Sequence, residues 1–147
     1  KPGGSPECLV AVISLPLGDE IGSNSGFSVL RAPIDEQTGQ LGAAYNQNNI
    51  ADIMNAIDVH PITGQHIAGF TLPSWEEAVT LAKEAHRTLD TIALVGWDIA
   101  LTPGGPLIIE GNVRPGPLAP QVAYKKPLGA TRFPELFAAH LDAPSGN

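Results

Sequence analysis

Three side chains that could bind a divalent cation stand between Gly96 and Gly116, in the stretch GWDIALTPGGPLIIEGNVRPG. Asp98 belongs to one apolar run, and Glu110 and Asn112 stand two apart in the next. Residues two apart on a strand point to the same face, so Glu110 and Asn112 should share one. Mg²⁺ commonly takes one or two carboxylates, with water and phosphate oxygens in its remaining positions. The pattern therefore predicts a magnesium site on a pair of strands.

A hairpin is the element that would bring these ligands together. Alternate residues of the first run form an apolar face, which comprises Val95, Trp97, Ile99 and Leu101. Trp97 is therefore expected in the core, with Asp98 on the opposite face. A three-residue loop over 103–105 would set Asp98 directly across from Glu110, with residues 93–102 and 106–112 paired antiparallel. Two other interpretations stay open: a solvated hairpin with an acidic face, and a hydrolase that uses Asp98 and Glu110 as general acid and base.

Further elements around this hairpin resemble the sugar-transfer-associated members of the ATP-grasp superfamily. The resemblance runs from Val59 to Asn112 and rests, in chain order, on His60-Pro61-Ile62-Thr63-Gly64, Gly69-Phe70, Leu72-Pro73-Ser74-Trp75, Gly96-Trp97-Asp98-Ile99-Ala100 and Glu110-Gly111-Asn112. It implies that Asp98, Glu110 and Asn112 hold Mg²⁺, or Mn²⁺, against the phosphates of ATP. It also implies a parent enzyme that ligates a carboxylate through an acyl phosphate, in exopolysaccharide or cell-surface biosynthesis.

Two positions depart from the pattern that this resemblance leads one to expect. Many ATP-grasp enzymes carry an arginine two residues before the metal-binding aspartate, where this chain has Gly96. An arginine is also expected in the strand near Leu9, where Val10 and Ala11 stand. Arg31 and Arg114 are the candidates to replace the missing phosphate contact. Arg114 follows Asn112 at the same parity, and the planar guanidinium suits phosphate.

The resemblance also bears on how much of an enzyme these 147 residues represent. They contain no glycine-rich phosphate loop, and the chain starts at Lys1 without an initiator Met. We therefore expect the second, metal-binding half of an ATP-grasp fold over residues 8–141, with tails at 1–7 and 142–147. Nucleotide and a small-molecule carboxylate would then be partners of the full-length parent. The isolated chain would be inactive, and the alternative is a non-catalytic fragment or interaction module.

Composition excludes several other classes of function. The net charge is −7, with 8 basic and 15 acidic residues, which argues against binding to nucleic acid or to an anionic membrane surface. No apolar run approaches the ~20 residues of a membrane-spanning helix. Cys8 is the single cysteine, so the chain has no internal disulfide framework, and a cytoplasmic location is the default. The oligomeric state is not predicted.

The remaining pattern predicts an α+β fold, with a mostly antiparallel sheet and a long helix packed on it. That helix should span residues 74–89, with Ser74 and Glu77 as a capping box. A buried strand is expected over 8–15 and a hairpin of 27–34 with 40–45. Residues 46–58 are ambiguous, and a short helix over 49–57, capped by Asn49, is one interpretation. Residues 117–128 should be irregular, and 133–141 helical with Pro134 in the first turn. His60 and His66 fit no known metal spacing. The resemblance implies instead that His60-Pro61 and Thr63-Gly64 shape a loop that borders the cleft faced by the hairpin.

Overall fold

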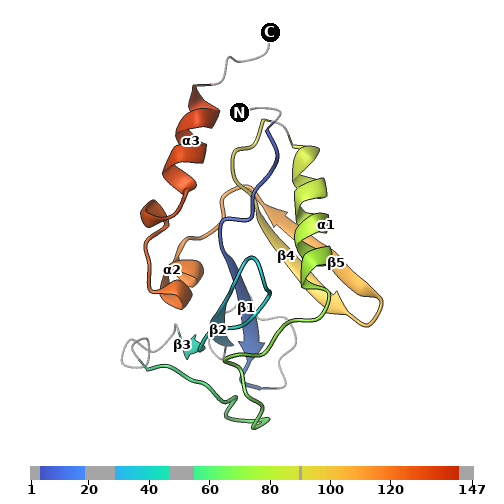
Figure 1. Cartoon of the computed structure of the whole chain (residues 1–147), viewed down its shortest axis with the longest axis vertical. Helices are drawn as coiled ribbons and strands as arrows, with labels where there is room; N and C mark the ends of the chain where they lie inside the picture. Colours follow the sequence, from blue (N-terminus) through green and yellow to red (C-terminus); the bar gives the residue numbers. More distant parts are fainter. Residues whose placement is uncertain (1–3, 19–28, 47–54, 90, 143–147) are drawn as a thin grey trace. The chain divides into compact units, whose positions relative to one another are not determined.

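The computed structural model describes residues 4–18, 29–46, 55–89 and 91–142. Its elements, in chain order, are β1 (Ala11–Pro16), β2 (Val29–Ile34), β3 (Tyr45–Asn46), α1 (Trp75–Arg87), β4 (Gly96–Thr102), β5 (Gly105–Asn112), α2 (Leu118–Tyr124), the short 3-10 helix η1 (Leu128–Ala130) and α3 (Phe133–Leu141) (Figure 1). The fold is α+β with small antiparallel sheets. Among the described residues the strands form two sheets, β1-β2-β3 and β4-β5, in place of the predicted single one.

The chain divides into two compact units, each described by itself below. The sheet unit comprises Val10–Leu72 and Pro117–Pro127, and it holds β1, β2, β3 and α2. The hairpin unit comprises Lys1–Leu9, Pro73–Gly116 and Leu128–Asn147, and it holds α1, β4, β5 and α3. The predicted extent of the subdomain, residues 8–141, stays a prediction. No helix in the described part of the chain is long and apolar enough to cross a membrane.

The core of the sheet unit is built on strand β2. β1 and β2 pair in regular antiparallel register, from Ala11 opposite Ile34 to Pro16 opposite Val29. Leu30 is fully buried, and the other buried apolar side chains of this unit are Val29, Ala32, Ile34, Leu41, Ala44, Tyr45, Ile67, Leu72 and Ala123. The predicted buried strand over 8–15 begins later, at Ala11, and is only half-buried. The burial of β2 instead makes it the centre of the unit.

Helix α2 was predicted to be irregular because prolines are frequent around it. The prediction is wrong because two of those prolines fall where a helix tolerates them. Pro117 is the N-cap and Pro120 lies in the first turn, where backbone N–H groups have no intrahelical partner. The Tyr124 hydroxyl ties α2 to the β1–β2 pair, since it accepts from the Ala11 N–H at 3.1 Å and lies 2.9 Å from the Ala11 carbonyl oxygen. It also contacts the carbonyl oxygen of Ile34.

Two turns of the sheet unit have the same architecture. In the first, Gly39 adopts a φ of 71° and its N–H donates to the Asp35 carbonyl. In the second, Gly64 adopts a φ of 70° and its N–H donates to the His60 carbonyl. In both, the first side chain accepts hydrogen bonds from the backbone N–H groups two and three residues later. Positive φ values near 70° favour glycine, so each turn requires a glycine at its fifth position.

His60 is the buried member of this pair of turns. Its Nδ1 accepts from the N–H groups of Ile62 at 3.4 Å and Thr63 at 3.3 Å. Its Nε2 lies 3.0 Å from the Pro16 carbonyl oxygen and donates to it, which fixes the neutral Nε2–H tautomer. The loop-shaping role expected of His60 is therefore confirmed in the sheet unit, where it joins the turn to the end of β1. A border with a cleft stays a prediction.

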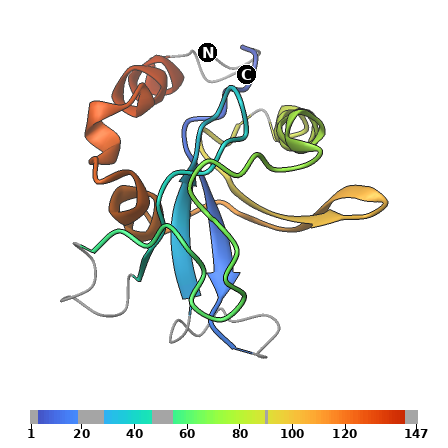
Figure 2. The ribbon, with the colours of Figure 1, turned by 60° about the horizontal axis from the view of Figure 1, so that its bottom comes forward.

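The hairpin unit is built from α1, β4 and β5, and α1 contacts both strands. Figures 1 and 2 show the two strands side by side as a hairpin. The predicted capping box is wrong, since Ser74 has φ 51° and makes no side-chain cap hydrogen bond. A capping residue normally has β-region backbone angles, which aim its side chain at the first free N–H groups. The left-handed conformation of Ser74 does not aim its side chain in this way. The helix begins one residue later than predicted, at Trp75.

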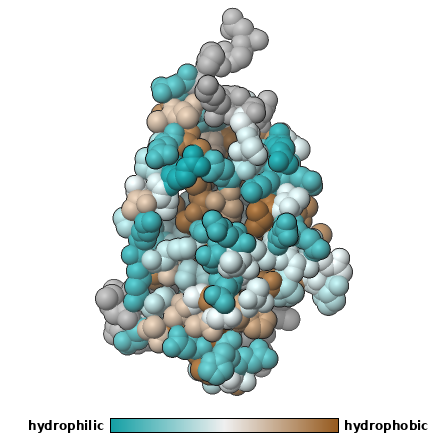
Figure 3. Space-filling model, viewed as in Figure 1, coloured by the Kyte–Doolittle hydropathy of each residue, from teal (hydrophilic) through white to brown (hydrophobic). Residues whose placement is uncertain are grey.

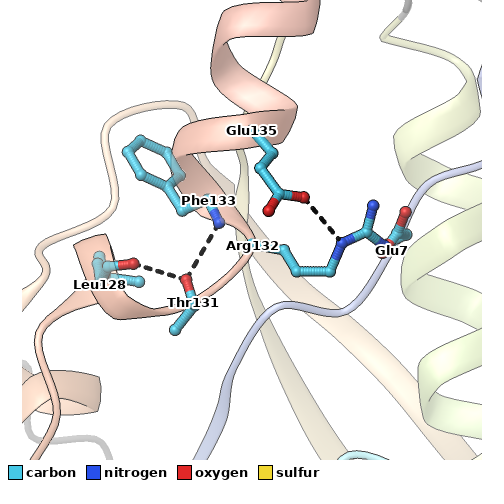
Figure 4. Close-up of polar contacts among 6 residues, drawn as sticks. All are labelled: Glu7, Leu128, Thr131, Arg132, Phe133 and Glu135. Carbon is cyan, nitrogen blue, oxygen red and sulfur yellow. Dashed lines mark hydrogen bonds and ion pairs between the residues drawn. The ribbon is translucent and has the colours of Figure 1, made fainter.

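Helix α3 is confirmed over Phe133–Leu141, with Pro134 in its first turn. The Thr131 hydroxyl donates to the Leu128 carbonyl at 2.6 Å and accepts from the Phe133 N–H at 3.1 Å, which joins η1 to α3 (Figure 4). Arg132 pairs with Glu7 from the N-terminal segment and with Glu135 one turn along. All three charged residues are exposed, so these ion pairs contribute little to stability.

The remaining prediction concerned a helix over 49–57. Residues 47–54 lie outside the described residues. At the other end of this segment, Ile57 and Ala44 exchange backbone hydrogen bonds of 2.8 and 3.0 Å as an isolated antiparallel bridge. Ile57 is therefore extended and does not belong to a helix.

Candidate metal centre

The predicted ligands lie on two neighbouring strands, as the sequence indicated. β4 and β5 pair antiparallel, and Asp98 is directly opposite Glu110. Gly96 is opposite Asn112, so the three ligand residues occupy two consecutive lateral pairs on one side of the hairpin. Asp98, Glu110 and Asn112 are all exposed. The side chains predicted to line one open surface are therefore brought together there.

The hairpin reaches this register by a route that differs from the predicted one. The loop has two residues, Pro103 and Gly104, because Thr102 already pairs with Gly105. This shorter loop sets Ile99 opposite Ile108, and the register then shifts by one residue before Asp98. The predicted three-residue loop is wrong. The one residue by which the observed loop is shorter is made up by one extra residue in β5, so Asp98 still lies opposite Glu110.

Ile109 is the inserted residue, since Ile108 pairs with Ile99 and Glu110 pairs with Asp98. A β-bulge of this kind sets two residues of one strand against one of the other. Simple alternation of faces consequently fails between Ile108 and Glu110, although they are two apart. It holds again from Glu110 to Asn112, where the prediction needed it.

A hydrogen bond within β5 orients two of the ligands. The Asn112 Nδ2 donates to Glu110 Oε1 at 2.8 Å. The bond directs the amide nitrogen toward the carboxylate, which leaves the Asn112 Oδ1 and the second Glu110 oxygen as acceptors. With the Asp98 carboxylate, the face offers oxygen atoms and no sulfur or imidazole. Such a donor set fits a hard cation such as Mg²⁺ or Mn²⁺ better than Zn²⁺.

The opposite side of the hairpin is covered at the same point. Trp97 pairs with Gly111, and a Cβ atom added to Gly111 would lie 2.6 Å from the Trp97 ring. The indole ring therefore rests on the glycine between the two β5 ligands. Trp97 is half-buried, less than the predicted core position implies, although its Nε1 is shielded from solvent and has no hydrogen-bond partner within the described residues.

The comparisons with known proteins bear on this geometry. A family model described as sugar-transfer associated ATP-grasp matches residues 8–132. The chain belongs to this family. No curated protein and no solved structure matches significantly. Family membership associates the chain with ATP binding and with ligase-like chemistry in sugar transfer, and the match extends through both compact units.

Gly96 occupies the position where many ATP-grasp proteins are expected to carry an arginine. A Cβ at Gly96 would lie 2.7 Å from the Pro115 Cβ, so the segment after β5 folds against this glycine. The structure has no room for a longer residue here unless Pro115 moves. The departure from the family pattern is therefore a packing feature, which the sequence alone did not explain.

The two arginines considered as replacements lie in different units. Arg114 is exposed, two residues beyond Asn112 in the hairpin unit. Arg31 lies on β2 in the sheet unit, paired in register with Ser14 and with Tyr45, and it donates a hydrogen bond to the Ser14 hydroxyl. Only Arg114 shares a unit with the ligands, and its phosphate contact stays a prediction.

The described residues contain no cluster of three or more histidine, cysteine, aspartate or glutamate side chains that could hold a metal ion. The predicted ligand set has only two residues of these types, Asp98 and Glu110, because its third member is the amide of Asn112. It therefore does not require such a cluster. His66 is exposed and follows the second turn. The hairpin face therefore stays a candidate site that rests on two carboxylates and one amide oxygen.

Proposed function

We propose that the β4–β5 hairpin supplies the metal- and phosphate-binding face of an ATP-dependent carboxylate ligase. The observation that carries the proposal is the register that sets Asp98 opposite Glu110, with Asn112 bonded to Glu110. Two carboxylates directly opposite each other repel, and a cation between them turns that repulsion into attraction. The sugar-transfer associated ATP-grasp family supports ATP as the nucleotide.

Each residue of the face has a distinct role in this proposal. Asp98 and Glu110 hold the cation by charge, and Asn112 adds a neutral oxygen. None of them acts as a general acid or base. Mg²⁺ or Mn²⁺, when bound, neutralises charge on the phosphate oxygens of ATP. Arg114, exposed beside this face, contributes a planar guanidinium to the same phosphates.

Membership of the sugar-transfer associated ATP-grasp family supports the reaction class that we propose. A substrate carboxylate is activated as an acyl phosphate, and an amine, thiol or hydroxyl nucleophile then displaces the phosphate. The product belongs to exopolysaccharide or cell-surface biosynthesis. We further propose that this chain corresponds to the metal-binding half of the fold, and that a nucleotide-clamping half completes the site, because the sequence contains no glycine-rich phosphate loop.

Metal binding by the 147-residue chain tests the proposal directly. The probe is Mn²⁺, followed by water-proton relaxation, with Mg²⁺ as competitor. The wild-type chain should bind Mn²⁺ weakly and release it to Mg²⁺. Glu110→Gln should weaken binding by about tenfold, equivalent to ~1.4 kcal/mol, because it removes one of two ligand charges. Its thermal midpoint without metal should be unchanged or slightly raised, since two facing carboxylates no longer repel.

Glu77→Gln is the matched control. Glu77 is also an exposed glutamate of the hairpin unit, in the first turn of α1, and lies outside the proposed face. Glu77→Gln removes one negative charge from a different place in the same unit. Any general electrostatic attraction of the chain for Mn²⁺ should therefore fall alike in both variants. Equal Mn²⁺ affinity in the two variants would remove Glu110 from the site. A collapsed midpoint in Glu110→Gln would assign Glu110 a structural role, and the alternative of a non-catalytic interaction module would then gain support.

A further inference from the structure

We propose that Trp97, resting on Gly111, acts as a register lock that places Asp98 opposite Glu110. The effect of this lock on cation binding rests on the proposed function. The pairing of Asp98 with Glu110, which the lock explains, is independent of any ligand. Neither residue touches the cation in this account. Both are positioning residues, and they act through the strand pairing on which the ligand set depends.

The turn of the hairpin by itself favours a different register. The two-residue loop pairs Thr102 with Gly105 and Ile99 with Ile108. Continued without a bulge, this register would set Asp98 opposite Ile109 and Trp97 opposite Glu110. Asp98 and Glu110 would then lie on opposite faces of the sheet, because a slip of one residue moves every side chain to the other face. No cation could bridge them.

Neighbouring strands do not decide between these two registers. Within the described residues the β4–β5 sheet has two strands, so no third strand fixes the pairing. Ile109 is 63% exposed as the bulged residue, so its burial does not drive the shift. Helix α1 contacts both strands, but the β5 residues from Ile109 to Asn112 are all exposed, so burial specifies their register only weakly and a specific side-chain contact can decide it.

The contact between Trp97 and Gly111 exists only in the observed register. A Cβ at Gly111 would lie 2.6, 3.0 and 3.2 Å from three atoms of the indole ring, so only glycine admits the ring at this distance. In the unbulged register the ring would meet the side chain of Glu110 instead. The observed register exchanges a Trp–Glu pair for a Trp–Gly pair in which the ring covers bare backbone.

A second contact acts in the same direction. Gly96 pairs with Asn112, and Pro115 packs where a Cβ of Gly96 would be. Gly96, which precedes Asp98, is thus covered by the Pro115 ring, and Gly111, which follows Glu110, is covered by the Trp97 ring. The Trp97–Gly111 pair lies between the Gly96–Asn112 pair and the Asp98–Glu110 pair, so it is flanked on both sides by ligand residues.

The test uses a deletion that makes the lock unnecessary. In Trp97→Ala, backbone nuclear Overhauser contacts between Asp98 and Glu110 should disappear, and Mn²⁺ affinity should fall about tenfold or more. Deleting Ile109 in the Trp97→Ala chain removes the inserted residue, so the two-residue loop then sets Asp98 opposite Glu110 in a regular hairpin. Both readouts should recover. Trp97→Phe should retain both, since a smaller ring still covers Gly111.

The outcomes separate this inference from the proposed function. Persistent Asp98–Glu110 contacts in Trp97→Ala would overturn the lock, as would failure of the Ile109 deletion to restore them. If Trp97→Ala does not fold, Trp97→Val with and without the deletion takes its place, because valine suits a strand. A wild-type chain that shows the Asp98–Glu110 contacts but binds no Mn²⁺ would overturn the proposed metal site alone. The lock would then be supported or overturned by the Asp98–Glu110 contacts in the variants.

Discussion

The two antiparallel sheets of this chain are specified in opposite ways. Strand β2 of the sheet unit is buried along most of its length and pairs with β1 in six regular steps. Strand β5 of the hairpin unit is mostly exposed and changes register part-way along. Among the described residues, ten of the eleven buried apolar side chains belong to the sheet unit, and Ala78 alone to the hairpin unit. Burial therefore specifies one sheet, and individual contacts specify the other.

This difference explains where the candidate chemistry lies. A ligand face must stay open to solvent, so it cannot also be the centre of a core. Large apolar residues are exposed in both units: Leu107, Ile109, Val113, Phe137 and Leu141 in the hairpin unit, and Val59, Ile62, Phe70 and Leu118 in the sheet unit. Figure 3 shows apolar residues that reach the surface between polar ones. The two sheets differ instead in the strands themselves, since β2 is largely buried and β5 is mostly exposed. Substitutions in the two sheets should consequently have different effects: loss of folding in the first and loss of ligand geometry in the second.

The largest expected effect is that of Leu30→Ala in the sheet unit. Leu30 is 0% exposed, so truncation leaves a cavity in the core and should cost about 2–5 kcal/mol. Ile109→Ala is the matched change in the hairpin unit. It removes apolar atoms from a side chain that is 63% exposed and should cost under ~0.5 kcal/mol. Chemical denaturation of both variants measures the difference, and equal losses would break the comparison between the sheets.

The sequence predicted the hairpin because its information is local. Alternating apolar residues, a Pro-Gly loop and the Asp, Glu and Asn positions together indicated two paired strands with three ligands on one face. The pairing of Asp98 with Glu110 is confirmed, although it depends on a bulge at Ile109 that no local pattern announced. The bulge follows from Trp97 meeting Gly111 across the strands, and such a contact becomes visible only when the register is known.

Two of the predictions that failed depended on one residue's usual preference. Ser74 has a common capping side chain, but its left-handed backbone prevents capping. The prolines around α2 indicated an irregular segment, yet Pro117 and Pro120 stand at positions that a helix accepts. The shared architecture of the turns that begin at Asp35 and His60 was not predicted, although Thr-Gly-Gln occurs in both, at Thr38 and at Thr63. That recurrence was the available signal.

The second prediction concerns the turn of the sheet unit that begins at the buried His60. His60→Ala removes the bond to the Pro16 carbonyl and the acceptor for the Ile62 and Thr63 N–H groups. Because His60 is only 8% exposed, we expect a loss of about 1–3 kcal/mol. His60→Asn should recover part of it, since an amide oxygen can accept from the turn but cannot reach Pro16. Denaturant midpoints check the order wild type, Asn, Ala, and full stability in His60→Ala would show that the turn needs no cap.

The smallest expected effect is at the turn that begins at the exposed Asp35. It compares this turn with the one that begins at the buried His60. Asp35 Oδ1 accepts from the Thr38 hydroxyl and N–H, both at 2.8 Å, and from the Gln37 N–H at 3.1 Å. The Thr38 hydroxyl is the main cause that lowers the pKa of Asp35 below its ordinary value, followed by the Thr38 N–H. A lowered pKa means that folding favours the carboxylate. The stability this contributes is present at neutral pH and is lost as the pH falls below about 4, through the lowered pKa.

Thr38→Val tests this assignment because it removes the hydroxyl donor and keeps the size of the side chain. The pKa of Asp35, followed by the carboxyl carbon resonance in an NMR titration, should rise toward its ordinary value without returning to it, since the two backbone donors remain. Thr63→Val is the control: it makes the same change at the same position of the other turn, where the capping group is the imidazole of His60. It should leave the Asp35 titration where it was. A shift of equal size in both variants would mean that the turns respond to general loosening of the sheet unit, and the Thr38 hydroxyl would lose its specific role.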